Sequence, residues 1–182
     1  MNMQEIIEIK KLEMSNVIEL FEDHITKFRT GRASAIILNS VVVDYYGTPT
    51  PIKHLASIVS PESHQLVVTP YDRSLVALAA AAISKSNLGV TVSNEGTLIR
   101  IKIPALTTET RQQIVKELKK DTENYRVKIR NLRRDANTEI KAEKQNEDWE
   151  RDGMEIIDKI TKEFIELLDK TSTEKETEIL TI

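Results

Sequence analysis

The strongest chemical pattern in the sequence is a run of basic residues between positions 126 and 137. The segment RVKIRNLRRDAN contains four arginines and one lysine, and its only acid is Asp135. Residues three or four positions apart share one face of a helix, so Arg126, Arg130, Arg133 and Asn137 form a line. At 1.5 Å per residue the line is about 16 Å long. Neighbouring guanidinium groups repel one another, and a phosphate-rich partner would offset that repulsion.

A simpler explanation is that these arginines are solvated or pair with acids of another helix. This is the commoner role of charged runs, and the C-terminal segment supplies candidate acids at Glu155, Asp158, Glu163, Glu166 and Asp169. Against it, arginine predominates over lysine, and the planar guanidinium suits phosphate. Arg126, Arg130 and Arg133 also lie outside the neighbouring apolar stripe, so we expect them to face outward. An outward line without aromatic residues favours a structured phosphate backbone, with Arg134 at its flank.

The composition limits the other classes of function. The 182 residues carry a formal net charge of -3, so any contact with nucleic acid must come from a local patch. The chain has no cysteine, which excludes disulfides and thiolate zinc sites. His24, His54 and His64 show no metal or catalytic spacing, and the sequence has no Gly-rich phosphate loop. We therefore expect no enzymatic activity, no metal site and no cofactor.

The sequence contains no pattern typical of a membrane or secretory segment. The N-terminal MNMQEIIEIKK alternates charged and apolar residues, unlike a signal peptide. The longest apolar run, LVALAAAAI, has nine residues, against the roughly 20 that a spanning helix needs. We expect a cytoplasmic protein without a membrane partner.

The first part of the chain carries an apolar heptad. Ile7, Met14, Phe21 and Phe28 lie seven positions apart, separated largely by charged residues. This period predicts an amphipathic helix over residues 4–28, which Gly31 is expected to end.

The residue pattern in the middle of the chain is typical of a small α/β unit. Segments 41–46 and 65–71 are rich in β-branched and aromatic residues and predict strands. Segment 91–103 predicts a hairpin, and Asp72 is expected to cap an alanine-rich helix running to about Asn87. Turns are predicted at Gly47, Pro49, Pro51 and Pro61.

A pattern typical of a helix returns near Thr107 or Thr108, either of which can cap a helix. The heptad of this second long helix is Leu118, Tyr125 and Leu132, interleaved with Thr122, Ile129 and Ala136. A break is expected near Asn146 to Gly153. A third amphipathic helix follows, with a stripe formed by Ile157, Ile160, Phe164 and either Leu167 or Leu168.

None of these helical stripes can bury itself alone, so both ends of the chain are expected to assemble one bundle. The predicted fold class is α+β: a discontinuous three-helix bundle, residues 1–30 and 105–182, with an inserted small β/α/β domain, residues 31–104. The connectors RTGR and IPALT join the two parts. Their candidate hinge residues are Thr30, Gly31, Pro104, Ala105 and Leu106.

Four segments of the sequence form a specific set of motifs: RTGRAS (29–34), VVVDYYGTPTPI (41–52), the triplet Asp72-Arg73-Ser74 and IRNLRRDAN (129–137). In their order and spacing they resemble the ribosome recycling factor family, and the match covers nearly the whole chain. The sequence departs from the family pattern at Ala35, where proline is common. It also departs in the segment QNEDWERDG, a turn that is shorter than usual.

The resemblance implies an L-shaped protein in which the bundle and the β/α/β domain are joined by a flexible hinge. It also implies that bundle arginines contact the ribosomal RNA of the large subunit. Arg29, Arg32, Arg130 and Arg133 fall on the family's RNA-contact positions. The candidate RNA-binding set is completed by Arg126, Arg134 and Asn137.

The function that the resemblance implies is mechanical. The protein is expected to bind the post-termination ribosome as a monomer and, with elongation factor G and GTP, to promote disassembly of the ribosome for reuse. The competing hypothesis is a helical adaptor or scaffold, whose heptads bind a partner protein and whose arginines pair with the acids of that partner. Such an adaptor would keep its binding after RNA is removed.

Overall fold

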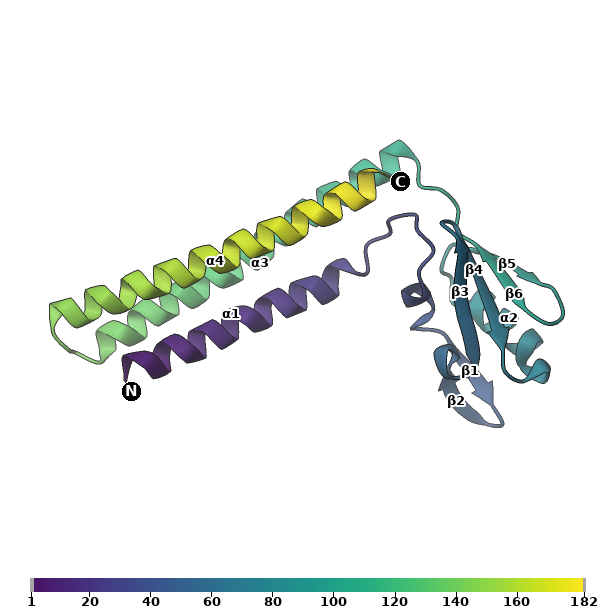
Figure 1. Cartoon of the computed structure of the whole chain (residues 1–182), viewed down its shortest axis with the longest axis horizontal. Helices are drawn as coiled ribbons and strands as arrows, with labels where there is room; N and C mark the ends of the chain where they lie inside the picture. The colour runs from purple at the N-terminus through teal and green to yellow at the C-terminus, as the bar shows by residue number, and fades with distance from the viewer. Residues whose placement is uncertain (1, 182) are drawn as a thin grey trace. The chain divides into compact units, whose positions relative to one another are not determined.

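The computed structural model describes residues 2–181, which divide into two compact units. The first unit comprises residues 2–29 and 108–181, and its regular elements are helices (Figure 1). The second unit, Thr30–Thr107, contains the strands and one α-helix. The predicted α+β fold class is confirmed.

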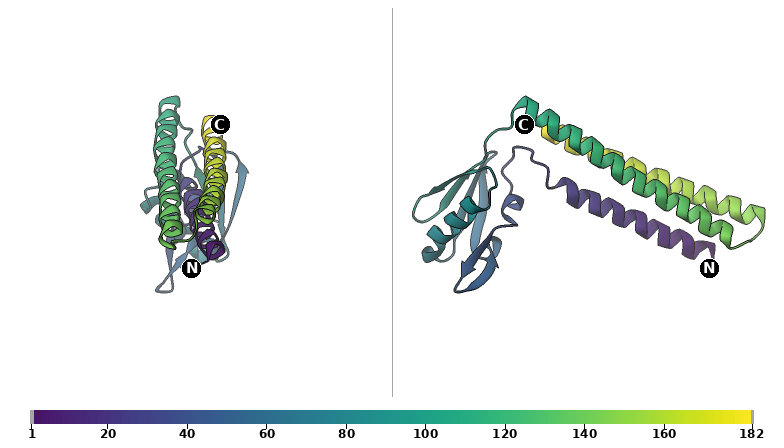
Figure 2. Two further views of the ribbon diagram at one scale, coloured as in Figure 1. Left: turned by 90° about the vertical axis from the view of Figure 1, so that its left-hand side faces the viewer. Right: turned by 180° about the vertical axis from the view of Figure 1, so that it is seen from behind.

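The helical unit consists of α1 (Met3–Ile25), α3 (Thr108–Ala142) and α4 (Glu147–Leu180). Figures 1 and 2 show the three helices lying side by side along their lengths. The predicted heptads supply the core, because Met14, Phe21, Leu118, Ile129 and Leu168 are all buried. Aromatic packing joins α1 to α3, with the rings of Phe21 and Tyr125 5.1 Å apart.

Two helix boundaries differ from the sequence-based prediction. Helix α1 ends at Ile25 rather than Phe28, and Thr26 caps it. The break before the last helix also lies earlier than expected: α4 begins at Glu147, where the Asn146 side chain accepts a hydrogen bond from the Trp149 backbone N–H at 2.8 Å.

Gly153 lies inside α4 rather than in a turn, so the predicted break at this residue is wrong. The physical reason is close packing. A Cβ atom on Gly153 would lie 3.2 Å from Cδ1 of Ile140 in α3 and 3.4 Å from Cε of Met3 in α1. The glycine thus permits three helices to approach at one level, and this outweighs its low helix propensity.

Buried hydroxyl groups set the pairing of α3 with α4. Thr122 Oγ1 and Ser172 Oγ are hydrogen-bonded at 2.8 Å between the two helices, and Thr122 Oγ1 also donates to the Leu118 carbonyl at 2.7 Å. Because a buried polar group without a partner is costly, this pair favours one register of the antiparallel helices over others.

The second unit contains two antiparallel sheets. Strands β1 (Val42–Tyr45) and β2 (Thr48–Pro51) form a hairpin. The larger sheet has the order β3-β4-β6-β5, with bounds β3 (Ala56–Glu62), β4 (Gln65–Pro70), β5 (Thr91–Asn94) and β6 (Ile99–Lys102). Helix α2 (Val76–Lys85) contributes Val76, Ala79 and Ile83 to the core that this sheet buries.

Strand β2 includes Pro49 and Pro51, and β3 includes Pro61, all three of which were predicted to lie in turns. Both contain proline, which lacks the backbone N–H that a central strand donates. The structure places β2 in a two-stranded sheet and β3 at the edge of the larger sheet, where proline is tolerated. Asp72 has the predicted capping role, since its side chain accepts from Ser74 N at 2.9 Å, but a 3₁₀ turn (Arg73–Leu75) precedes α2.

The hairpin turn between β1 and β2 depends on Gly47. Tyr45 pairs with Thr48, so the loop is Tyr46-Gly47, and both residues have positive φ, 49° and 82°. This is the two-residue turn that matches the twist of the flanking strands.

We predict that Gly47→Ala lowers the free energy of unfolding by about 1–2 kcal/mol, because an L-residue is strained in this conformation. No atom lies within 4 Å of the added methyl, so steric conflict does not contribute. Urea unfolding of the wild type and the variant measures the difference. Equal stability would show that the turn adopts another conformation in solution.

Candidate nucleic-acid interface

The arginines of the basic run all lie on α3, but their side chains differ in exposure and in their partners. Arg126 is the most buried of them, with a side chain that is 23% exposed. Its guanidinium forms ion pairs with Glu123 on the same helix and with Asp169 on α4. The hydrogen bond to Asp169 raises the pKa of Arg126 above its ordinary value. The expectation that Arg126 faces outward is therefore wrong, because α4 supplies an acid directly opposite it.

Arg133 also reaches across to α4. Its Nε lies 2.6 Å from Oδ1 of Asp158, and both side chains are about half exposed, at 47% and 51%. A third cross-helix pair joins Lys119 Nζ to Glu176 Oε1 at 2.8 Å. Residues 119, 126 and 133 are seven positions apart, which is the spacing of the ion pairs that flank a coiled-coil seam. We call these three pairs the seam pairs.

Arg130 and Arg134 are the arginines of the run that α4 does not hold. Arg130 is exposed, and its Nη1 lies 3.6 Å from Oε1 of Glu123, which also pairs with Arg126. Arg134 is exposed, and within residues 2–181 its guanidinium has no acidic partner. Their charges are therefore available to an external ligand.

Arg134 belongs to a second line, one position away from the predicted line. We call it the outer line, and its members are Lys120, Asn124, Val127, Asn131, Arg134, Thr138 and Lys141. The residues alternate in spacing between four and three, all are exposed, and none is acidic. Sequence reasoning missed this line because it followed the arginines alone, although the same spacing rule would have found it.

Asn137, the last member of the predicted line, is half-buried. Its Oδ1 atom is buried and has no hydrogen-bond partner, the only such side-chain atom within residues 2–181. The carbonyl end of this amide therefore does not face the solvent beside Arg130 and Arg134.

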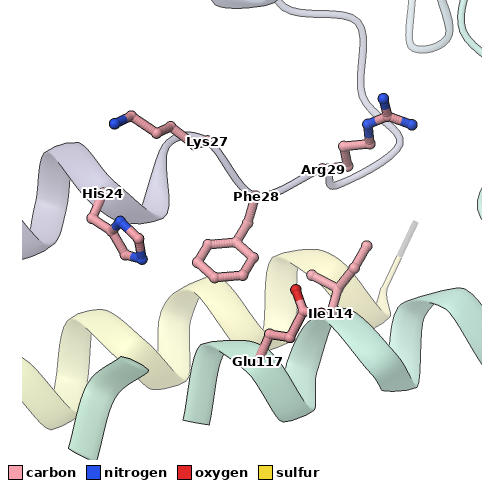
Figure 3. Close-up of a pocket in the computed structure, with 6 residues that line it drawn as sticks. All are labelled: His24, Lys27, Phe28, Arg29, Ile114 and Glu117. Atoms are coloured by element: carbon pink, nitrogen blue, oxygen red, sulfur yellow. The ribbon is translucent and has the colours of Figure 1, made fainter. Parts of the chain in front are cut away.

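Arg29 lies at the other end of the helical unit. It lines a hollow of about 280 Å³ together with His24, Lys27, Phe28, Ile114 and Glu117. Figure 3 shows the Phe28 ring directed toward Ile114 and Glu117 of α3, whereas the Lys27 and Arg29 side chains extend away from α3. Glu117 precedes Arg130 by 13 residues, which corresponds to about 20 Å along the helix. The structure thus separates Arg29 from the arginines of the basic run.

Arg32 belongs to the second unit, where it is exposed and has no acidic partner among the described residues. Of the candidate hinge residues, Thr30 and Gly31 are buried, whereas Pro104 and Ala105 are exposed and Leu106 is half-buried. The Gly31 carbonyl lies 2.7 Å from His64 Nδ1, which can donate to it. His64 therefore holds one of the candidate hinge residues.

His24 has a packing role between α1 and α3. Its Nε2 lies 2.6 Å from Asp121 Oδ2, and its ring packs against Phe28 and Tyr125 at centroid distances of 5.7 and 5.8 Å. Lys128 Nζ lies 4.3 Å from the centroid of the Tyr125 ring. The lysine of the basic run thus already has an aromatic partner.

The described residues contain neither a metal-ligand cluster nor a membrane-spanning helix. Within residues 2–181, no three His, Asp or Glu side chains are grouped so that they could hold a metal ion. None of the described helices has the length and apolar character needed to cross a membrane.

Comparisons with known proteins agree on one family. A sequence profile of the family "Ribosome recycling factor" matches residues 21–180. The ribosome-recycling factor of Geobacillus sp. (strain WCH70) is 43% identical over 183 residues, covering 98% of this chain and 99% of the relative. That of Halothermothrix orenii is 40% identical over 176 residues, covering 94% and 95%.

Two solved structures are also similar. A solution structure of the ribosome recycling factor has a TM-score of 0.81 and 33% identity, covering 100% of this chain and 99% of the other. The second depicts the T. thermophilus ribosome recycling factor and E. coli elongation factor G bound to the E. coli post-termination complex. Its matching chain has a TM-score of 0.65 and 34% identity, covering 99% of this chain and 100% of the other.

Proposed function

Because the chain belongs to the ribosome recycling factor family, we propose that it binds the post-termination ribosome and promotes its disassembly with elongation factor G and GTP. The observation that carries this proposal is similarity over essentially the full length to a factor placed with elongation factor G on the post-termination complex. The large ribosomal subunit and elongation factor G are then the partners. The helical adaptor is not favoured, since the full-length relatives are recycling factors.

We propose that the helical unit docks on ribosomal RNA mainly through Arg130 and Arg134. Both are exposed, and α4 supplies neither with a counter-ion. Arg29 and Arg32 provide further phosphate contacts at other points of the chain. Arg126 joins α3 to α4 through its ion pair with Asp169 and does not contact RNA directly, because Asp169 and Glu123 hold its guanidinium.

We propose that the factor itself makes and breaks no covalent bond. Contacts between arginine and phosphate supply affinity and register without reading the base sequence. The energy for splitting comes from GTP hydrolysis by elongation factor G, and the connectors around Gly31 and Pro104 form the hinge between the two domains. The site of action is the cytoplasm, where the factor works as a monomer.

The test is disassembly of purified post-termination complexes, followed by sucrose-gradient separation of ribosomes and subunits. We expect free subunits when the protein, elongation factor G and GTP are all present, and few when any one is omitted. Intact ribosomes under all conditions would contradict the proposal. Protein binding that survives nuclease digestion of the ribosomes would instead support an adaptor.

A further inference from the structure

The three seam pairs differ in how easily a phosphate group could replace the acid. In the Lys119 pair and the Arg126 pair, one partner is largely buried, with exposed fractions of 27% for Glu176 and 23% for Arg126. Arg126 is also held by a second acid. The pair between Arg133 and Asp158 is about half exposed on both sides. Only this last seam pair can therefore open without uncovering a buried charge.

Asp158 also occupies a particular part of the Arg133 guanidinium. The contact is made through Nε, at 2.6 Å, and no other ion pair involves this arginine among residues 2–181. A guanidinium has five N–H donors in a planar fork, so one carboxylate oxygen leaves most of them unused. The acid therefore offsets part of the positive charge of Arg133 while leaving donors for a second acceptor.

We propose that Asp158 is a positioning residue that competes with RNA phosphate for Arg133 and thereby limits the affinity of the factor for the large subunit. Docking obliges the carboxylate and an RNA phosphate to share Arg133, so the wild type makes less than one full phosphate contact through this residue. The negative charge of Asp158 stays near the bound RNA. A factor that must leave the ribosome after each cycle gains faster release from such an internal competitor. This inference rests on the proposed docking face.

Salt dependence gives the sharpest test, because the logarithm of the binding constant falls linearly with the logarithm of salt concentration in proportion to the phosphates neutralised. Removing the charge of Asp158 by Asp158→Asn frees Arg133 for one full contact. We expect the slope to steepen by at most about 0.7–0.9, the value for one complete phosphate contact. We also expect binding about two- to fivefold tighter near physiological salt, the range for one exposed ion pair.

The experiment is co-sedimentation of the full-length protein with purified large ribosomal subunits across a salt series. Asp152→Asn is the matched control, because it removes the same charge from α4 at a residue whose single ion pair among residues 2–181 is with Arg151, at 3.6 Å. Asp158→Glu restores the charge and should return slope and affinity to wild-type values. Thermal unfolding should change little in all three variants, since these ion pairs are exposed.

The outcomes separate the inference from the function on which it rests. Equal affinity of Asp158→Asn and Asp152→Asn for the subunit would overturn the proposed competition between Asp158 and RNA phosphate. Weaker binding by Asp158→Asn than by the wild type would also overturn it, because Asp158 would then orient Arg133 for RNA contact. If neither the wild type nor any variant binds subunits, the proposal that α3 docks on ribosomal RNA is wrong. The proposed role of Asp158 is then wrong as well.

Discussion

Replacing Arg130 and Arg134 together by alanine is expected to weaken binding to large ribosomal subunits about ten- to fiftyfold near physiological salt. Both side chains are exposed, and α4 neutralises neither of them. Each lost phosphate contact should reduce the slope of log affinity against log salt by about 0.7–0.9, so the double variant should lose about 1.5. Co-sedimentation over a salt series measures both quantities.

The matched control for this prediction is the double variant Lys162→Ala and Lys170→Ala. It removes the same formal charge from exposed residues of α4. Among residues 2–181, each of these lysines forms an ion pair only with an acid one turn along its own helix. We expect its affinity to stay within about twofold of the wild type. If the two double variants weaken binding equally, net charge rather than the face of α3 governs docking.

The substitution Phe21→Ala is expected to lower the free energy of unfolding of the helical unit by about 3–5 kcal/mol. Phe21 is fully buried in the core shared by the three helices, and its ring packs against Tyr125. The loss combines the transfer free energy of the ring with the cavity left behind. Urea unfolding followed by helical circular dichroism measures it.

The adjacent residue supplies the control. Leu20 lies on the same helix and is 59% exposed, so Leu20→Ala should change stability by less than about 0.5 kcal/mol. Similar losses for both variants would show that the face of α1 assigned to the core is wrong.

The helical part of the fold could be predicted because its heptads are regular. A seven-residue apolar period requires a partner surface, and three such stripes satisfy one another in a bundle. Gly153 misled the prediction because a glycine ends a helix in one setting and permits close helix packing in another. The packing partners Ile140 and Met3 are distant in sequence, so local pattern could not distinguish the two settings.

The strands with proline were missed for a similar reason. Pro49 and Pro51 argue against a central strand, and only the sheet topology shows that β2 has a single neighbour. Propensity describes the local chain, whereas strand pairing depends on the whole unit.

For the candidate interface, the sequence identified the helix that carries the basic run. It did not show which arginines of that helix lack a counter-ion from α4 and are available to an external ligand. Spacing alone placed Arg126, Arg130 and Arg133 on one line. Which of them α4 neutralises depends on the register of the antiparallel helices, which brings Asp169 opposite Arg126 and Asp158 opposite Arg133. That register is set by packing and by the buried pair Thr122 and Ser172, which no pattern within α3 reveals.

Docking through α3 as a step in ribosome recycling is tested most directly by the rate at which post-termination complexes split. Light scattering measures this rate in the presence of elongation factor G and GTP. The wild type and the Arg130→Ala, Arg134→Ala variant would each be titrated to saturation. We expect the variant to need at least about tenfold more protein for half-maximal rate while reaching a similar maximum, because the substitutions remove affinity alone. No acceleration by the wild type, or identical titrations for both proteins, would contradict the proposed mechanism.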